Sequence, residues 1–79
     1  MLAEALGHLV KGMVEHDESV EVRTVQDRRG ETLQVHVHPD DLGRVIGRRG
    51  RTARALRTVM GALADGAGVR VDIVETDAT

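Results

Sequence analysis

The period of the apolar pattern changes several times along this 79-residue chain, and these changes constrain its fold most. From Leu2 to Val14 apolar residues recur at spacings of three and four, which predicts a helix with one apolar face. Val20 and Val22 then alternate with polar residues, as a short strand requires. Val25 breaks this alternation, which predicts a bulge or a frayed end.

A hairpin is predicted next, because residues 27–30 have the composition of a tight turn. Strict alternation of apolar and polar residues over 33–38 then gives the clearest strand pattern in the chain, with Leu33, Val35 and Val37 on one face. Pro39 ends this strand, since proline cannot donate to the ladder. We expect the carboxylates of Asp40 and Asp41 to cap the helix that follows.

Two helices separated by glycines occupy the middle of the chain. The first is short and turns three residues inward, Leu42, Val45 and Ile46. The second runs from Arg51 to Ala64, with apolar residues at Ala53, Leu56, Val59, Met60 and Leu63. Gly66 and Gly68 mark its end, residues 69–73 alternate as a final strand, and residues 76–79 read as a frayed tail.

This order of helix, strand, strand, helix, helix and strand predicts an α+β fold in a single domain spanning residues 1–79. Three helices packed on one face of a three-stranded sheet would bury every apolar stripe. The hairpin strands are antiparallel, and we expect the last strand to run parallel to a neighbour, because it arrives through a helical crossover. None of the 79 residues is aromatic, so the core is thin and dimerisation would help it.

Positive charge is concentrated in one block of a chain whose net charge is -2. Six of the eleven basic residues, and no acid, lie between Arg44 and Arg57. The other five oppose thirteen acidic residues, so a +6 block sits on a -8 remainder. Such a patch attracts polyanions locally while the rest of the surface repels them.

Several classes of protein are excluded by composition. The absence of cysteine excludes a disulfide framework, a thiolate zinc site and a cysteine nucleophile. The first apolar stretch is interrupted by Glu4, His8 and Lys11, which fits neither a signal peptide nor a membrane span. We therefore expect a cytoplasmic protein.

The segment Gly47-Arg48-Arg49-Gly50 interrupts two helical patterns and carries the chemistry. Glycines allow positive φ and a close approach of a ligand backbone. The helix that starts after Gly50 directs unpaired N–H groups and its positive dipole end towards the loop. Arg48 and Arg49 add two mobile cations at the tip, so the segment is predicted to clamp phosphates.

The run Val45-Ile46-Gly47-Arg48-Arg49-Gly50-Arg51-Thr52 resembles the V-I-G-x-x-G signature of KH domains. The order of elements is similar to that of type II KH domains, and the length is similar to that of small one-domain bacterial KH proteins that bind RNA. This resemblance covers nearly the whole chain. It implies a type II KH fold, α-β-β-α-α-β, in which the loop clamps the backbone of about four nucleotides.

The resemblance also implies a function and partners. It implies non-catalytic binding of single-stranded RNA, as an RNA chaperone or post-transcriptional regulator, without a cofactor or metal. The implied RNA-binding residues are Val45, Ile46, Gly47, Arg48, Arg49, Gly50, Arg51 and Arg54, with Arg57 a less certain member. Small bacterial KH proteins of this kind form homodimers and associate with a larger RNA-binding protein that has its own KH domain.

The sequence leaves one other function open and gives little support to the rest. A protein-interaction or dimerisation module with secondary RNA binding stays open, because a fold does not fix a function. No nucleophile–base pair or nucleotide motif points to an enzyme, and the Walker lysine is missing. His36 and His38 share one side of a strand but lack a third ligand with evident spacing, and His8 and His16 read as surface helix positions.

Overall fold

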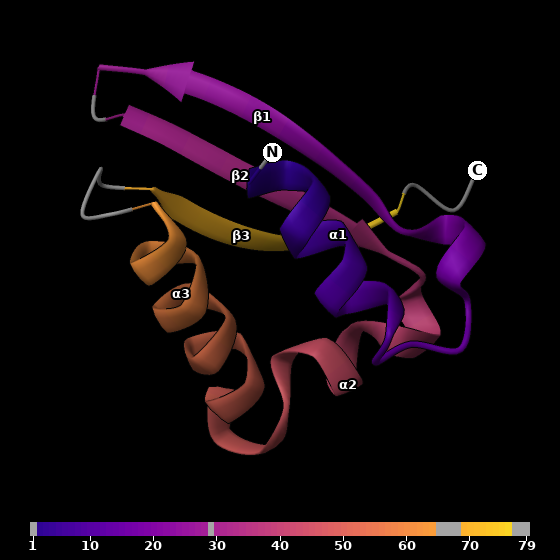
Figure 1. Cartoon of the computed structure of the whole chain (residues 1–79). Helices are drawn as coiled ribbons and strands as arrows, with labels where there is room; N and C mark the ends of the chain where they lie inside the picture. The colour runs from indigo at the N-terminus through magenta and orange to yellow at the C-terminus, as the bar shows by residue number, and fades with distance from the viewer. Residues whose placement is uncertain (1, 29, 65–68, 77–79) are drawn as a thin grey trace.

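The computed structural model describes residues 2–28, 30–64 and 69–76 (Figure 1). Its helices and strands follow in the predicted order: α1 (Leu2–Lys11), β1 (Glu21–Asp27), β2 (Gly30–Val37), α2 (Leu42–Ile46), α3 (Arg51–Leu63) and β3 (Arg70–Glu75). Short 3-10 turns lie between them: η1 (Asp17–Ser19), η2 (Pro39–Asp41) and η3 (Arg48–Gly50). None of these helices is long and apolar enough to cross a membrane.

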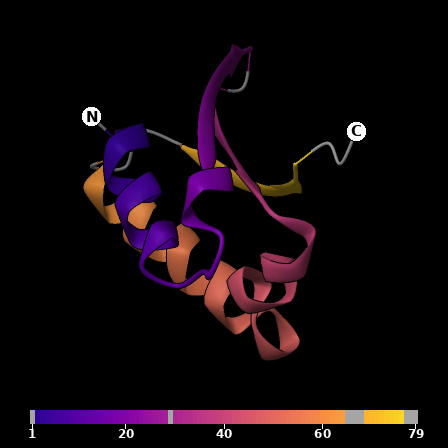
Figure 2. The same ribbon diagram turned by 90° about the vertical axis from the view of Figure 1, so that its right-hand side faces the viewer.

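The three strands form one sheet in the order β1-β2-β3. β1 and β2 pair antiparallel, and β2 and β3 pair parallel, as the crossover through two helices predicts. Figure 2 shows the helices on one side of this sheet, with the other side bare. The predicted α+β fold with three helices on one face is confirmed.

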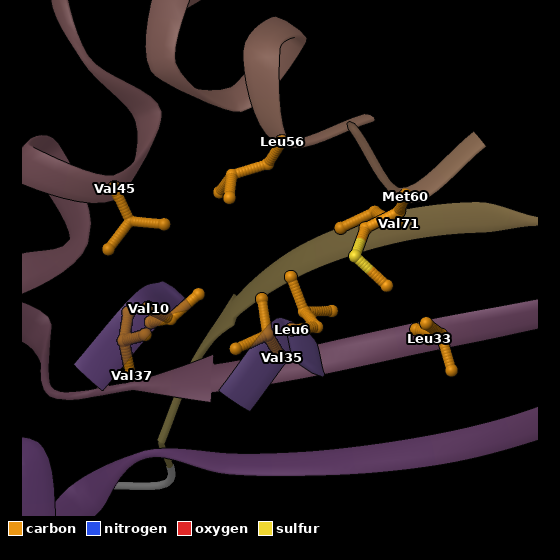
Figure 3. Close-up of a cluster of buried hydrophobic side chains, with 9 residues drawn as sticks. All are labelled: Leu6, Val10, Leu33, Val35, Val37, Val45, Leu56, Met60 and Val71. Carbon is orange, nitrogen blue, oxygen red and sulfur yellow. The ribbon is translucent and has the colours of Figure 1, made fainter. Parts of the chain in front are cut away.

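The core lies between the sheet and the helices (Figure 3). Alternate residues of β2 point inward against the amphipathic helices α1 and α3, since side chains of a strand alternate between faces. The buried cluster consists of Leu6, Val10, Leu33, Val35, Val37, Val45, Leu56, Met60 and Val71. These aliphatic side chains and one methionine fill the space without any aromatic ring.

α1 ends three residues earlier than the sequence pattern predicts. The chain turns after Lys11, where the N–H of Met13 donates to the carbonyl of Val10 at 2.9 Å, a tighter i to i−3 bond. Met13 and Val14 still pack against the core from outside the helix. Apolar spacing therefore predicted that Met13 and Val14 pack against the core, but it did not predict where the helix stops.

The predicted irregularity at Val25 is wrong. Pairing of β1 with β2 continues without a break from Glu21, opposite His36, to Asp27, opposite Gly30. Val25 points to the bare face of the sheet, where it is 41% exposed. A single apolar residue on a solvent face needs no bulge.

The end of the chain matches the sequence pattern in part. α3 closes with the N–H of Ala64 donating to the carbonyl of Met60 at 2.9 Å. The N–H of Thr76 donates to the carbonyl of Val37 at 2.7 Å, so Thr76 still belongs to the ordered pairing and is not frayed. Gly66, Gly68 and residues 77–79 lie outside the described residues.

The predicted cap by Asp40 and Asp41 is also wrong. Asp41 is 2% exposed, and no side chain caps α2. Its carboxylate instead accepts the backbone N–H groups of Glu15 and His16, at 3.2 and 3.0 Å. The N–H of Asp40 donates to Nδ1 of His38 at 3.0 Å, so a histidine caps η2. Asp41 thereby ties the connection between α1 and β1 to the start of α2.

Candidate nucleic-acid interface

The loop between α2 and α3 has a left-handed backbone at three positions. Gly47 has a φ of 77°, Arg49 a φ of 57° and Gly50 a φ of 73°. Glycine adopts this region without steric cost, whereas an arginine there is strained. Gly47 ends α2, its carbonyl accepts the N–H of Gly50 at 3.1 Å, and the chain enters α3 directly. The loop is thus a tight reversal that displays its tip.

Gly47 is required for close packing as well as for its backbone angle. A Cβ at this position would collide with the side chain of Thr52 and lie 2.9 Å from the backbone nitrogen of Thr52. The first turn of α3 therefore sits directly against the glycine. At Gly50, by contrast, a Cβ would meet nothing within 4 Å. The two glycines of the motif are fixed by different physical demands.

The loop between α2 and α3 lies at the lower end of the molecule in Figure 1, and its tip residues Arg48 and Arg49 are exposed. Behind them α3 begins without a side-chain cap. Its first-turn N–H groups and helix dipole add partial positive charge to the two guanidinium groups. Glycines, arginines and an uncapped helix start supply donors for an oxyanion but no nucleophile or general base.

A track of arginines continues from the loop along α3. Arg51, Arg54 and Arg57 are exposed and follow one another at spacings of three, which places them on adjoining parts of the helix surface. Arg57 lies nearest the sheet, because its Nε donates to the carbonyl of Val71 on β3 at 3.1 Å. The track therefore runs towards β3 from the loop Gly47–Gly50, which we call the clamp loop.

A hollow of about 420 Å³ adjoins this end of the track. It is lined by Arg57 and by the start of β3 at Val69, Arg70, Val71 and Asp72. The hollow is open and mixes apolar with charged walls.

Arg44 differs from the other arginines of the block. Its Nη2 forms an ion pair with Oε1 of Glu15 at 3.0 Å, between two exposed side chains. Among the described residues, no carboxylate lies within ion-pair distance of Arg48, Arg49, Arg51 or Arg54. Arg57 has no carboxylate partner among the described residues either, so Arg44 is the one ion-paired arginine of the six.

The two apolar site residues predicted from the motif are placed differently. Val45 is completely buried in the core and supports the loop from beneath. Ile46 is 38% exposed, so the expectation that it turns inward with Leu42 and Val45 is wrong. Its outward position at the end of α2 leaves it available to a ligand, whereas Val45 has no surface to offer.

A family model for the KH domain of KhpA and KhpB matches residues 3–75, which covers all the helices and strands described above except Leu2, the first residue of α1. The chain belongs to the KhpA/KhpB KH-domain family. The resemblance seen in the sequence motif is therefore confirmed, and the mixed three-stranded sheet with three helices agrees with a KH-type fold.

Relatives in this family are similar over nearly their whole length. A protein of Streptomyces coelicolor is 64% identical over 77 residues, which cover 98% of this chain and 96% of the relative. One of Mycobacterium bovis is 53% identical over 77 residues, covering 98% and 95%. One of Halalkalibacterium halodurans is 41% identical over 70 residues, covering 86% and 92%. All three carry the name RNA-binding protein KhpA.

Two residues that shape the site were missed by sequence reasoning. Thr52 was quoted only as the end of the motif, yet its close approach restricts position 47 to glycine. Asp41 was assigned to a cap, yet it fixes the segment that carries Glu15, the partner of Arg44. Both contacts depend on tertiary structure, so a local sequence pattern does not predict them. The glycine at position 47 is the one signal in the sequence that a small residue is needed there.

Proposed function

We propose that this chain binds single-stranded RNA without catalysis, holding the phosphate backbone in the loop from Gly47 to Gly50. The observation that carries this proposal is the left-handed loop that displays Arg48 and Arg49 at the uncapped start of α3. Membership of the KH family and the name shared by the relatives support it. In KH domains a loop of this pattern clamps about four nucleotides of backbone.

The proposed RNA-binding residues are Ile46, Gly47, Arg48, Arg49, Gly50, Arg51 and Arg54, with Val45 as support from the core. Phosphates lie against the glycines and the two tip arginines. Arg51 and Arg54 carry the backbone on towards β3, and Arg57 closes the track. Since the chain has no Phe, Tyr or Trp on which a base could stack, sequence discrimination is modest.

Low selectivity with a concentrated positive site suits an RNA chaperone or a post-transcriptional regulator that acts in the cytoplasm. Binding of this kind depends mainly on phosphate contacts, which are sequence-independent. The acidic remainder of the chain repels RNA elsewhere and so limits the bound strand to the arginine track.

The test is the affinity of a short fluorescent single-stranded RNA as a function of salt. For three to four phosphate contacts, log affinity should fall by roughly 2 to 3 per decade of salt. With Arg48 and Arg49 both changed to Asp, affinity should fall at least about tenfold and the slope should flatten by about 1.4. Unchanged affinity, with circular dichroism showing an intact fold, would refute the clamp.

The single variant Arg49→Asp should also weaken RNA binding. Arg28→Asp is its matched control. Both residues are exposed, and both changes lower the net charge equally. Arg28 lies at the β1–β2 turn, across the molecule from the clamp loop in Figure 1. The control should bind RNA almost as well as the parent chain, since a loss caused by net charge alone would affect both variants.

Self-association is the second part of the proposal, and the surface of α3 favours it. Arg57 reaches β3 from one flank of the helix, so Val59 and Leu63 lie on the other flank, turned towards α1. They are 43% and 54% exposed, and Leu9 on α1 is exposed as well. We propose that this apolar flank pairs with a second copy of the chain or with the KH domain of a larger RNA-binding protein.

A further inference from the structure

A side-chain cluster away from the arginine track joins two distant parts of the chain. His16, which precedes η1, lies beside His38 and Asp40 at η2. Nε2 of His16 is 3.8 Å from Oδ2 of Asp40, and Nδ1 of His38 is 3.7 Å from the same oxygen. Within residues 2–28, 30–64 and 69–76 this is the one group of three or more His, Cys, Asp or Glu residues whose ligand atoms converge.

We propose that His16, His38 and Asp40 form a binding site for a borderline divalent transition-metal ion such as Zn²⁺. Two imidazole nitrogens and one carboxylate oxygen are a common donor set for Zn²⁺, with water in the fourth position. Tetrahedral Zn²⁺ with ligands at about 2.1 Å has ligand atoms about 3.4 Å apart. The two distances to Oδ2 of Asp40, 3.7 and 3.8 Å, are within a few tenths of an ångström of this spacing, and all three ligand atoms lie within 4.8 Å of one another.

Glu18 supports the assignment of the ligand atom on His16. Its Oε1 lies 3.7 Å from Nδ1 of His16, on the ring nitrogen that does not face Asp40. A carboxylate on the second nitrogen of a metal-binding histidine fixes the tautomer and strengthens the ligand. Glu18 therefore acts as a positioning residue that leaves Nε2 of His16 free to bind the ion.

The backbone around the cluster is already held in place. The buried carboxylate of Asp41 accepts the N–H of His16, so the segment bearing His16 is fixed against η2. The imidazoles themselves are more adjustable, since about a third of each side chain is exposed. A rigid backbone with adjustable side chains is the arrangement in which an ion can draw its ligands together.

Binding requires two local changes. The rings of His16 and His38 are stacked, with centroids 4.0 Å apart, whereas an ion lies in the plane of each ring it binds. The rings must therefore turn out of the stack. Nδ1 of His38 also exchanges the N–H of Asp40 for the metal, which makes the affinity moderate. The ordering of divalent ions should follow Co²⁺ < Ni²⁺ < Cu²⁺ > Zn²⁺, with Mg²⁺ unbound.

The test is titration of the full chain, prepared without a histidine tag, with Zn²⁺ followed by calorimetry. One ion should bind per chain. His16→Gln, His38→Asn and Asp40→Asn should each weaken binding at least about tenfold, and Glu18→Gln should weaken it less. His38→Asn retains an oxygen that can accept the N–H of Asp40, so the cap and the fold are preserved.

His8→Gln is the control, because this histidine is exposed on α1 outside the cluster. His8→Gln should leave Zn²⁺ affinity unchanged. The double variant Arg48→Asp with Arg49→Asp should leave it unchanged as well. Absence of saturable Zn²⁺ binding to the parent chain would overturn the site. Equal losses in His8→Gln and His16→Gln would overturn it too, since binding would then be scattered over surface histidines.

Discussion

At the residue scale, the clamp loop stores backbone strain in Arg49. It is the one non-glycine residue with positive φ among those described, and such strain collects at functional sites. Arg49→Gly should raise the free energy of unfolding by about 1 kcal/mol, because glycine removes the left-handed penalty. The same change should lower RNA affinity, since it deletes a cation. Urea unfolding and RNA titration would measure the two effects, and a loss of both stability and affinity would contradict this account of Arg49.

The two motif glycines should tolerate alanine unequally. Gly47→Ala adds a collision with Thr52 to the left-handed penalty, so it should cost about 2 kcal/mol or more. Gly50→Ala carries the backbone penalty alone and should cost about 1 kcal/mol. Urea midpoints of the two variants test this contrast, and an equal loss would mean that the loop moves away from Thr52.

The sequence motif nominated the residues of the candidate site, but it did not predict the environment of each side chain. Gly47 to Gly50 lead directly into the helix that carries Arg51 and Arg54, because a loop and the first turns of its helix are local in sequence. Val45 and Ile46 could not be told apart, since in a five-residue helix both fit an inward stripe. The ion pair of Arg44 with Glu15 could not be predicted from the sequence, because the two residues lie far apart along the chain.

At the element scale, Asp41 holds the α1–β1 connection against the start of α2. Burial alone would raise the pKa of Asp41, but the N–H groups of His16 and Glu15 and the charges of His16 and Arg44 together lower it by more. The pKa therefore lies below its ordinary value of 3.8.

A carboxyl group with a pKa lowered by folding stabilises the fold above its unfolded-state pKa, and this stability is lost as the pH falls through the folded value. Unfolding midpoints in urea should thus decline from about pH 4 downward. Asp41→Asn should lower the midpoint near neutrality, because an amide cannot accept both N–H groups, and should weaken the acid dependence. An unaltered acid profile in this variant would show that other carboxylates cause the decline.

Helices and strands were predicted well where the apolar periodicity extends over many residues. They were predicted poorly where contacts with another segment of the chain set their boundaries. The ten residues of α1 and the eight of β2 carry clear patterns. Contacts with other segments determine where α1 ends, why β1 continues past Val25 and what Asp41 binds. A local sequence pattern does not predict such contacts.

At the scale of the whole molecule, the arginine track and the apolar flank lie on different sides of α3, so RNA binding and self-association should be separable. Val59→Lys with Leu63→Lys should convert a dimer to a monomer in light scattering, because each copy would bring two buried cations to the interface. RNA affinity per chain should stay within about threefold.

A parent chain that is monomeric at micromolar concentration would contradict the pairing of copies and leave the larger KH protein as the partner to test. Circular dichroism controls for folding, since both positions are already exposed. The crossover rule predicted that the last strand runs parallel to a neighbouring strand, and the structure shows that this neighbour is β2.

The most direct test of the RNA clamp is an NMR titration of the ¹⁵N-labelled chain with a short single-stranded RNA. The account predicts that the largest amide shifts fall on residues 46–52, with smaller ones at Arg54 and Arg57. Amides of β1, at the far edge of the sheet, should move least. Shifts concentrated on β1, or on Val59 and Leu63 with the loop silent, would contradict the clamp.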